Sequence, residues 1–313
     1  MMTSSASWKA NENRDAANLG HVAVVTGATR GIGHATAMQL AQLGAEVVLV
    51  GRDERRLDAV RVELRASTGN ERVSWVRADF ASLVSVRVAA KEIARRWPTI
   101  HVLVNNAGVN VARRATTADG YEMTFAVNHL APFLLTTLLL PALSRGAPSR
   151  IVNVASVFAH FGRLNLDDLM YERRRYNSTG AYNQSKLATV MSAMELAAHL
   201  EGAGITVNCV SPGLVATDLL REHMWSAARW LRPLWQWPLL TPDRAARRIV
   251  RVATSDALAT VTGHSFAGSV RPIAVPRRAR DAAARARLWE LSQTLTNAPD
   301  VTAMLGASSG GAR

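Results

Sequence analysis

The sequence predicts a single α/β domain built on a doubly wound parallel sheet, with helices on both faces. Three observations lead to this fold class. Short apolar segments rich in β-branched residues alternate along the chain with longer segments of helical periodicity. A glycine-rich turn follows the first apolar segment, as expected where a strand leads into a helix. With 313 residues and 48% hydrophobic composition, the chain can bury one large core.

The predicted elements follow one another in strand and helix order. Strands are expected at residues 21–27, 45–51, 72–79, 100–108, 149–156 and 204–213, and helices at 32–44, 52–68, 82–97, 119–144 and 180–202. The strands are apolar along nearly their whole length, which predicts a parallel sheet covered on both faces. The domain is expected to span residues 20–302, between flexible tails at 1–19 and 303–313.

The apolar stretch "LAPFLLTTLLLPAL" at 130–143 could be a membrane-spanning helix or a helix buried in the core. It is shorter than the ~20 residues that span a bilayer, and it contains two prolines. It is therefore predicted to be a buried helix.

The composition limits the class of protein and its partners. A net charge of +13 and a pI near 11.2 suit nucleic acid, an anionic membrane surface or a phosphorylated cofactor, and they also follow from an arginine-rich composition alone. Six arginines lie in residues 271–287, but no aromatic stacking pattern or reading helix accompanies them, so nucleic-acid binding is not predicted. The single cysteine, Cys209, excludes an intramolecular disulfide and a cysteine-based metal site. Polar residues 1–20 do not resemble a signal peptide, and a cytoplasmic location is expected.

The turn "VVTGATRGIG" at 24–33 predicts a site for a dinucleotide pyrophosphate. Glycines at such a turn let backbone amides and a helix N-terminus approach a phosphate, although they also occur for purely structural reasons. The residues assigned to this contact are Gly27, Thr29, Arg30, Gly31, Ile32 and Gly33. Together with the element order, they predict a Rossmann-type domain.

The end of the second predicted strand indicates which dinucleotide binds. An acidic residue there would accept a hydrogen bond from the adenosine ribose, but the strand ends in Gly51 and Arg52, and Asp53 comes one place later. Arg52 and Arg30 suit a 2′-phosphate, so the predicted cofactor is NADP(H). The alternative is that both arginines are solvated surface charges.

Tyr182 and Lys186 are spaced to share one helix face. Lys186 is one of only three lysines, in a chain whose other cationic side chains are arginine. An ammonium beside a phenol favours the phenolate and moves the tyrosine toward a useful pKa. Taken alone, a tyrosine and a lysine at this spacing also occur by chance on the solvent-exposed face of a helix.

Six motifs together resemble the short-chain dehydrogenase/reductase family. They are "TGATRGIG" (26–33), "NNAG" (105–108), the asparagine of "FAVNHLAPFLL" (125–135), "IVNVAS" (151–156), "YNQSK" (182–186) and "SPGLVATDL" (211–219). They occur in the family's order and cover residues 21 to about 270. The segments "GRLNLDDLM", "LLTPDRAARRIV" and "LWELSQTLTN" are similar to the retinol dehydrogenase and WW-domain oxidoreductase-like branch.

The resemblance implies a catalytic tetrad and a set of cofactor contacts. The tetrad is Asn128, Ser156, Tyr182 and Lys186. Tyr182 would supply the proton, Ser156 would hold the substrate oxygen, and Asn128 would anchor a water relay to Lys186. The further cofactor contacts are Asp79, Asn106, Ala107, Gly108, Pro212, Gly213 and Thr217, in addition to Tyr182 and Lys186. Asp79 as a helix cap and Pro212-Gly213 as a turn are the structural alternatives. Where family members often have two serines, this chain has Ala155-Ser156.

The expected activity is NADP(H)-dependent interconversion of an alcohol and a carbonyl on a lipophilic small molecule that is retinoid-, steroid- or isoprenoid-like. A non-catalytic NADP(H)-binding regulator is the alternative, although all four tetrad side chains are present. A sugar-nucleotide epimerase or dehydratase is disfavoured because little chain remains after residue 270 for a substrate domain. The apolar face of "FLLTTLLLPAL" is compatible with a homodimer or homotetramer through the helices at 119–144 and 180–202, and equally with plain core packing.

A tryptophan-rich segment at 216–240 is predicted to be a mobile substrate lid. Trp225, Trp230, Trp235 and Trp237 would line an apolar pocket. Packing of the segment on its own domain is the second interpretation. Contact with a membrane interface is the third, and it is not favoured because two prolines interrupt any long amphipathic helix.

Overall fold

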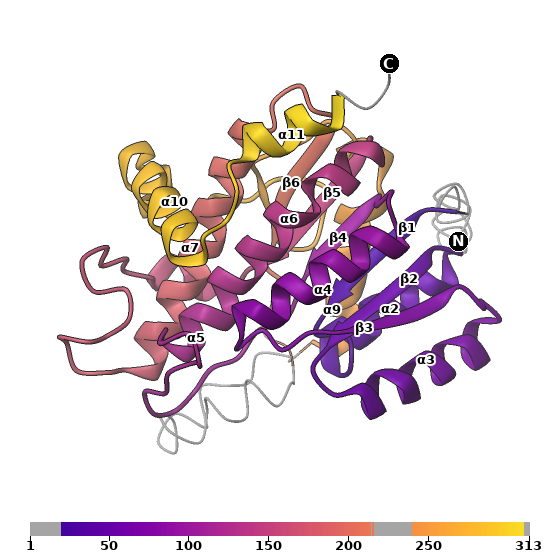
Figure 1. The fold of residues 1–313 in the computed structure, drawn as a ribbon, viewed down its shortest axis with the longest axis horizontal. Helices are drawn as coiled ribbons and strands as arrows, with labels where there is room; N and C mark the ends of the chain where they lie inside the picture. The colour runs from indigo at the N-terminus through magenta and orange to yellow at the C-terminus, as the bar shows by residue number, and fades with distance from the viewer. Residues whose placement is uncertain (1–19, 214, 216–239, 310–313) are drawn as a thin grey trace, which may run out of the picture.

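The computed structural model describes residues 20–213, 215 and 240–309 of the chain. Its described part contains a seven-stranded parallel sheet in the order β3-β2-β1-β4-β5-β6-β7 (Figure 1). The strands are β1 Val22–Thr26, β2 Glu46–Gly51, β3 Val73–Arg77, β4 Val102–Asn105, β5 Ser149–Val154, β6 Ile205–Val210 and β7 Ser265–Phe266. The predicted doubly wound α/β fold is confirmed, and the six predicted strands all form.

The strand order changes direction between β1 and β4: β2 and β3 follow β1 toward one edge of the sheet, and β4 to β7 follow toward the other. Val25 of β1 pairs with Leu49 of β2 on one side and with Val104 of β4 on the other. Because all strands are parallel, their carboxyl ends meet at one edge, and the crevice beside this switch point is where such sheets bind ligands. The predicted site residues that follow the strands are therefore gathered at one edge.

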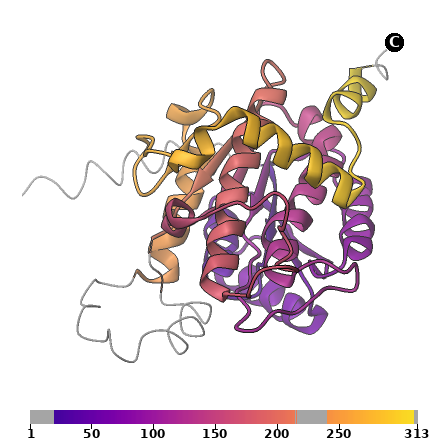
Figure 2. The same cartoon turned by 90° about the vertical axis from the view of Figure 1, so that its left-hand side faces the viewer.

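Helices cover both faces of the sheet (Figures 1 and 2). The longer ones are α2 Gly31–Gln42, α3 Glu54–Thr68, α4 Leu83–Arg96, α6 Ala131–Arg145, α7 Ser178–His199, α9 Pro242–Thr254, α10 Ala282–Thr296 and α11 Val301–Ser309. Side chains of α2, α3 and α9 build the core on one face, and those of α4, α6, α7 and α10 build the core on the other. Each core is lined by Val, Leu, Ile and Ala, whose removal from water is the main stabilising contribution to the fold.

Local sequence signals set several helix ends. Asp53 caps α3 by accepting a hydrogen bond from Arg56 N at 3.2 Å, and α3 ends at Gly69, which has φ of 69°. Asn177 caps α7 in the same way, accepting from Gly180 N at 3.2 Å. These caps satisfy backbone groups that a helix end leaves unpaired.

The long apolar helical segment is a core element. Met123–Arg145 is long and apolar enough to cross a membrane by length and composition, but 89% of its apolar window is buried inside the domain. The predicted buried helix is therefore confirmed. It is not one regular helix, because α5 Met123–Phe125 leads into a π-helical turn, η1 Ala126–Leu130, before α6 begins.

The structure differs from the sequence prediction near the C-terminus. Instead of a flexible tail from residue 303, it has the helix α11. Val301 is buried, and Met304 and Leu305 pack against the core. Figures 1 and 2 show α11 beside α6 and α10 beside α7. Assembly through α6 and α7 stays a prediction, but the chain's own C-terminal helices cover part of the surface it would use.

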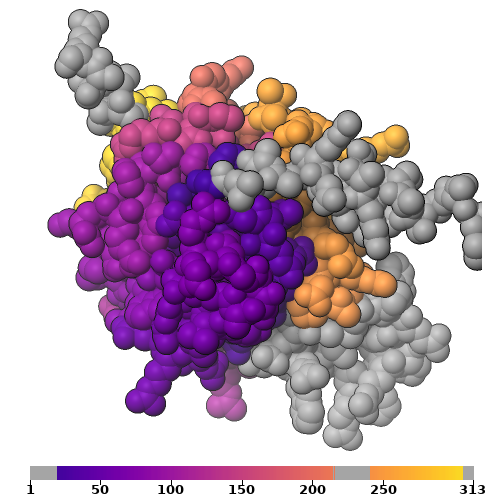
Figure 3. All heavy atoms as spheres, turned by 90° about the vertical axis from the view of Figure 1, so that its right-hand side faces the viewer, coloured from indigo at the N-terminus to yellow at the C-terminus, as the bar shows by residue number. Residues whose placement is uncertain are grey.

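The N-terminal part of the domain lies beside α9, which comes much later in the chain. Figure 3 shows the indigo N-terminal part beside the orange residues that follow position 240. Gln39 of α2 donates a hydrogen bond from Nε2 to the Asp243 carbonyl of α9 at 3.0 Å. This contact fixes α9 beside the helix that begins at the glycine turn.

Candidate active site

The glycine turn brings backbone closer to backbone than any side chain would allow. Gly27 and Gly31 have φ of 66° and 58°, in the left-handed region that favours glycine. A β-carbon on Gly33 would stand 2.3 Å from the Gly27 carbonyl oxygen. Arg30 is exposed and immediately precedes α2. The turn therefore leaves the amides of this helix N-terminus accessible to a phosphate.

The "NNAG" segment holds the glycine turn in place. Thr26 Oγ1 accepts hydrogen bonds from the backbone amides of Asn106 at 2.9 Å and Ala107 at 3.0 Å. The Asn106 side chain donates to the Thr26 carbonyl at 2.8 Å. Asn106 and Ala107, predicted from the resemblance to contact adenosine, thus have a structural role in supporting the turn. Thr26 was not among the predicted site residues, although it belongs to the quoted glycine motif.

An exposed arginine follows β2, and the nearest acidic residue in the sequence is engaged in other contacts. Arg52 is exposed directly after Gly51, which is buried and has Thr29 beside it. Asp53 is engaged as the cap of α3 and pairs with Arg56 at 3.4 Å. Asp79 follows β3 and accepts from the Ala81 amide at 3.0 Å, which forms a local turn. The helix-cap alternative for Asp79 is wrong, because Ser82 caps α4 by accepting from the Ser85 amide. The half-buried Asp79 side chain lies at the carboxyl edge.

Three of the four predicted tetrad residues lie where β5 ends against α7. The side chains of Ser156 and Tyr182 are hydrogen-bonded to each other. Lys186 lies one turn further along α7, with its Nζ 5.8 Å from the centre of the Tyr182 ring. That ammonium is buried and donates to the Val154 carbonyl at 2.8 Å. The structure thus brings together Ser156, Tyr182 and Lys186 from two elements far apart in the sequence.

The electrostatics of the pair differ from the expectation. Burial raises the pKa of Tyr182 to about 12, and the hydrogen bond with Ser156 opposes that rise. Burial lowers the pKa of Lys186 to about 8. The structure therefore does not show Lys186 bringing the pKa of Tyr182 toward neutral pH, because burial of the phenol is the largest effect on it. The tyrosine is a protonated phenol at neutral pH.

Asn128 completes the cluster from the π-helical turn η1. Its side chain accepts from the Val109 amide at 2.7 Å, and it donates to the Val109 carbonyl at 2.9 Å and to Ser185 Oγ at 3.0 Å. A β-carbon on Gly108 would lie 3.3 Å from Asn128 Oδ1 and 3.8 Å from Lys186 Nζ. Asn128 and Lys186 therefore approach Gly108 together. Turns of the π type occur frequently at functional sites.

The loop after β6 is held by an arginine that the sequence did not single out. Arg248 of α9 donates from Nη1 to the Pro212 carbonyl at 3.1 Å, and the guanidinium lies against Gly213, which has φ of 93°. Burial lowers the pKa of Arg248. In so arginine-rich a chain, nothing in the sequence distinguishes Arg248 from its exposed neighbours. Thr217 and the predicted lid, apart from Leu240, lie outside the described residues.

The fold and the site together define a class of protein. A doubly wound parallel sheet carries at one edge a glycine turn, an accessible arginine after the second strand and a Ser-Tyr-Lys cluster beside a buried asparagine. These are the elements of a nicotinamide-dependent oxidoreductase that acts on alcohols and carbonyls.

Comparison with known proteins gives the family. Residues 21–226 match the short chain dehydrogenase family. Human retinol dehydrogenase 11 is 40% identical over 280 residues, a match that covers 90% of this chain and 87% of the relative. The chain therefore belongs to the short-chain dehydrogenase family, and it is similar to the retinol dehydrogenase branch within it.

Solved structures agree with this assignment. A crystal structure of an uncharacterized protein from Mycobacterium paratuberculosis has a TM-score of 0.72 and 33% identity, covering 90% of this chain and 97% of that one. The Pseudomonas aeruginosa RhlG/NADP active-site complex has a TM-score of 0.65 and 26% identity, covering 79% of this chain and 94% of that one.

Proposed function

We propose that this protein is an NADP(H)-dependent oxidoreductase that interconverts an alcohol and a carbonyl on a lipophilic, retinoid-like small molecule. The observation that carries the proposal is the hydrogen-bonded pair of Ser156 and Tyr182 beside buried Lys186, at the carboxyl edge of the sheet. Relatives named retinol dehydrogenase support an apolar alcohol as the substrate class. A cytoplasmic location stays a prediction.

The residues present fit a dinucleotide. The backbone of Gly33 can lie this close to the backbone of Gly27 only because neither residue has a side chain. Such a tight glycine turn is what lets the backbone approach a pyrophosphate. Arg52 is exposed directly after β2, where it would hold an adenosine 2′-phosphate, and Asp53 is engaged in capping α3. A bidentate guanidinium contact to phosphate favours NADP(H), and the RhlG/NADP complex is consistent with this choice. Pro212 and Gly213, which Arg248 holds, would support the nicotinamide end, as the family resemblance implies.

Two of the tetrad residues, Tyr182 and Ser156, act on the substrate oxygen. When bound, the nicotinamide supplies a hydride to the carbonyl carbon or accepts one from the alcohol. Tyr182 Oη gives its proton to the substrate oxygen during reduction and takes it back during oxidation. Ser156 Oγ holds the same oxygen at the position where negative charge develops. Because the pKa of Tyr182 is about 12, the phenol is protonated at neutral pH, which favours carbonyl reduction.

Apolar side chains beside the tetrad support a lipophilic substrate. Phe158 packs edge-on to Tyr182, with ring centres 6.4 Å apart. Val157 and Phe161, in the short helix that follows Ser156, are 39% and 70% exposed. Exposed apolar side chains next to reacting groups are characteristic of a site that takes up apolar ligands.

Tyr182→Phe tests the proposal. The variant keeps the ring and its packing but has no proton to give, so turnover should fall by about a hundredfold or more, while NADPH affinity changes little. NADPH consumption against a panel of isoprenoid, steroid and short-chain aldehydes supplies the substrate for this measurement. Turnover near the wild-type level in Tyr182→Phe would show that the tetrad assignment is wrong. Cofactor binding without turnover of any aldehyde or alcohol would favour the non-catalytic regulator.

A further inference from the structure

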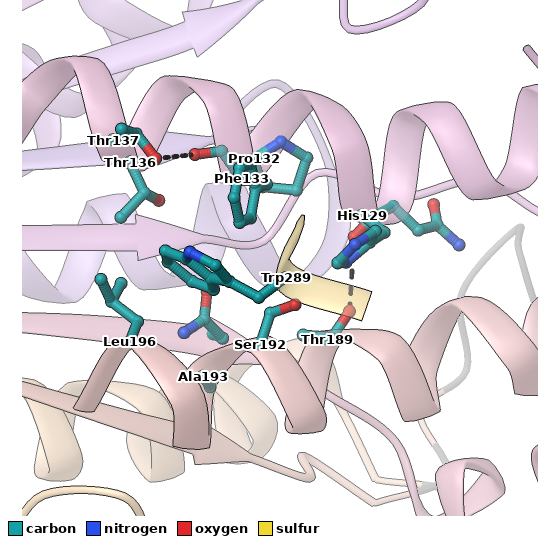
Figure 4. A pocket seen from close by; sticks show the side chains of 12 residues that line it. His129, Pro132, Phe133, Thr136, Thr137, Thr189, Ser192, Ala193, Leu196 and Trp289 are labelled. Atoms are coloured by element: carbon teal, nitrogen blue, oxygen red, sulfur yellow. Dashed lines mark hydrogen bonds between the residues drawn. The ribbon is translucent and has the colours of Figure 1, made fainter. Parts of the chain in front are cut away.

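His129 follows Asn128 in the π-helical turn, and its ring is hydrogen-bonded to α10. Its side chain is buried and lies 4.9 Å, centre to centre, from the ring of Phe125. Figure 4 shows His129 of η1, Phe133 of α6 and Trp289 of α10 around one small cavity, with side chains of α7 on its other side. The cavity has a volume of about 40 Å³ and also touches Asn128. His129 therefore connects the π-helical turn η1, which carries Asn128, to the outer helix α10.

The link is a hydrogen bond to Ser292 of α10. His129 Nε2 lies 2.8 Å from Ser292 Oγ, and the Ser292 hydroxyl donates its own proton to the Leu288 carbonyl at 2.7 Å. With that proton donated to the Leu288 carbonyl, Ser292 Oγ accepts from a His129 ring protonated at Nε2, and this is the tautomer that the proposal requires. Burial lowers the pKa of His129 to about 3, so the ring is neutral at physiological pH. The bond is a fixed, neutral contact that does not change with pH in the physiological range.

The helix at the other end of the bond is itself anchored. Trp289 packs edge-on against Phe133 of α6, with ring centres 4.7 Å apart. Arg285 forms an ion pair with Glu195 of α7 at 3.1 Å, and both side chains are less than one-fifth exposed. Tyr121 donates to the Leu295 carbonyl at 2.6 Å. These contacts hold α10 in place, so Ser292 gives the turn η1 a fixed hydrogen-bond partner.

We propose that Ser292, acting through His129, is a positioning residue for Asn128. The inference rests on the proposed function, because Asn128 matters only if the tetrad does the chemistry. Asn128 and His129 are neighbours in one π-helical turn, so a shift of either residue moves the backbone of the other. Asn128 is held on one side by Val109 and Ser185, and His129 is held on the other by Ser292. The two sets of bonds together determine where the Asn128 side chain lies.

Ser292→Ala removes the acceptor and leaves a buried N–H without a partner. The turn is expected to shift so that His129 finds another contact, and Asn128 moves with it. Displacement of a catalytic group by a fraction of an ångström to an ångström is expected to lower kcat by about tenfold to a hundredfold. The affinity for NADPH, which depends on the glycine turn and Arg52, should change less than about twofold because those residues lie elsewhere on the sheet edge.

Two further variants separate positioning from loss of stability. Ser292→Thr keeps the hydroxyl and should retain most of the activity. Thr296→Ala is the matched control, because Thr296 is buried on the same helix and its hydroxyl bonds only to carbonyls of α10, at 2.6 Å to Ser292. Thermal unfolding of all three variants shows whether each is folded at the assay temperature. An equal loss of kcat in Thr296→Ala and Ser292→Ala would overturn the proposal.

A measurement without turnover completes the test. In the wild type, ¹⁵N NMR of the histidine rings should show a neutral ring protonated and hydrogen-bonded at Nε2, and Ser292→Ala should change this signal while Thr296→Ala leaves it unchanged. A wild-type His129 protonated at Nδ1 would also overturn the proposal. Failure of the proposed function is recognised separately, since Tyr182→Phe would then retain activity whatever Ser292→Ala does.

Discussion

A β-carbon on Gly33 would stand 2.3 Å from the carbonyl oxygen of Gly27, so the two glycines fix the geometry of the turn by lacking side chains. Gly33→Ala must push α2 away from the turn and open the pyrophosphate site. We expect a loss of about 1–3 kcal/mol in the free energy of unfolding. NADPH binding should weaken by more than about tenfold, because the phosphate depends on close approach of the backbone. Cofactor fluorescence titration and urea unfolding measure the two effects.

The control for this prediction is Gly268→Ala, where the added methyl group would meet the Arg248 side chain at an ordinary 3.4 Å. Its effects on NADPH binding and on stability should both be small. If Gly33→Ala bound NADPH as tightly as this control, the glycine turn would not be the pyrophosphate site.

Arg52→Ala tests the choice between the two nicotinamide dinucleotides. A guanidinium pairs with the 2′-phosphate that only NADPH carries, so the substitution should weaken NADPH binding by about 10- to 100-fold. NADH binding should remain within about twofold of wild type, because no contact to it is lost. Arg55→Ala, which removes an exposed arginine from the first turn of α3, is the matched control. Equal weakening of both dinucleotides by Arg52→Ala would contradict the assignment.

Lys186 should make the stability of the fold depend on pH. Burial lowers its pKa from 10.5 to about 8, so between these values the unfolded chain holds a proton that the folded protein has released. The contribution of Lys186 to stability therefore becomes more favourable as the pH rises from about 8 to 10.5. In Lys186→Met this dependence is absent. The stability of the variant relative to wild type should fall by on the order of 3 kcal/mol between pH 7 and pH 10.5.

Urea unfolding at several pH values measures this difference. Burial also raises the pKa values of Tyr182 and Cys209 to about 12. Loss of the Lys186 charge leaves the Cys209 pKa no lower, so both groups stay protonated in the two folded proteins up to pH 10.5 and their contributions are nearly equal. Lys91→Met, which removes an exposed lysine of α4, is the control. A difference between Lys186→Met and wild type that stays constant from pH 7 to pH 10.5 would show that the ammonium is not desolvated.

The fold and most of the site could be predicted from the sequence, because they depend on local patterns. Apolar β-branched runs identified six strands, and the motifs after them identified the glycine turn, Ser156, Tyr182 and Lys186. The seventh strand, Ser265–Phe266, was missed because two residues are too few to show a pattern. The helix α11 was missed because its short, small-residue sequence gives little helical signal, and packing on α6 supports it.

The sequence by itself determined which residue types stand at the ends of the strands, since spacing along the chain fixes which helix face or strand end each residue occupies. Only the tertiary structure decided how those residues are charged and held. The high pKa of Tyr182, the bond from Lys186 to Val154, the support of Pro212 by Arg248 and the tie from His129 to Ser292 all join residues that are distant in the chain or depend on burial. Hydrogen-bond partners and desolvation depend on which atoms the folded core brings together, and a local pattern in one sequence does not specify them.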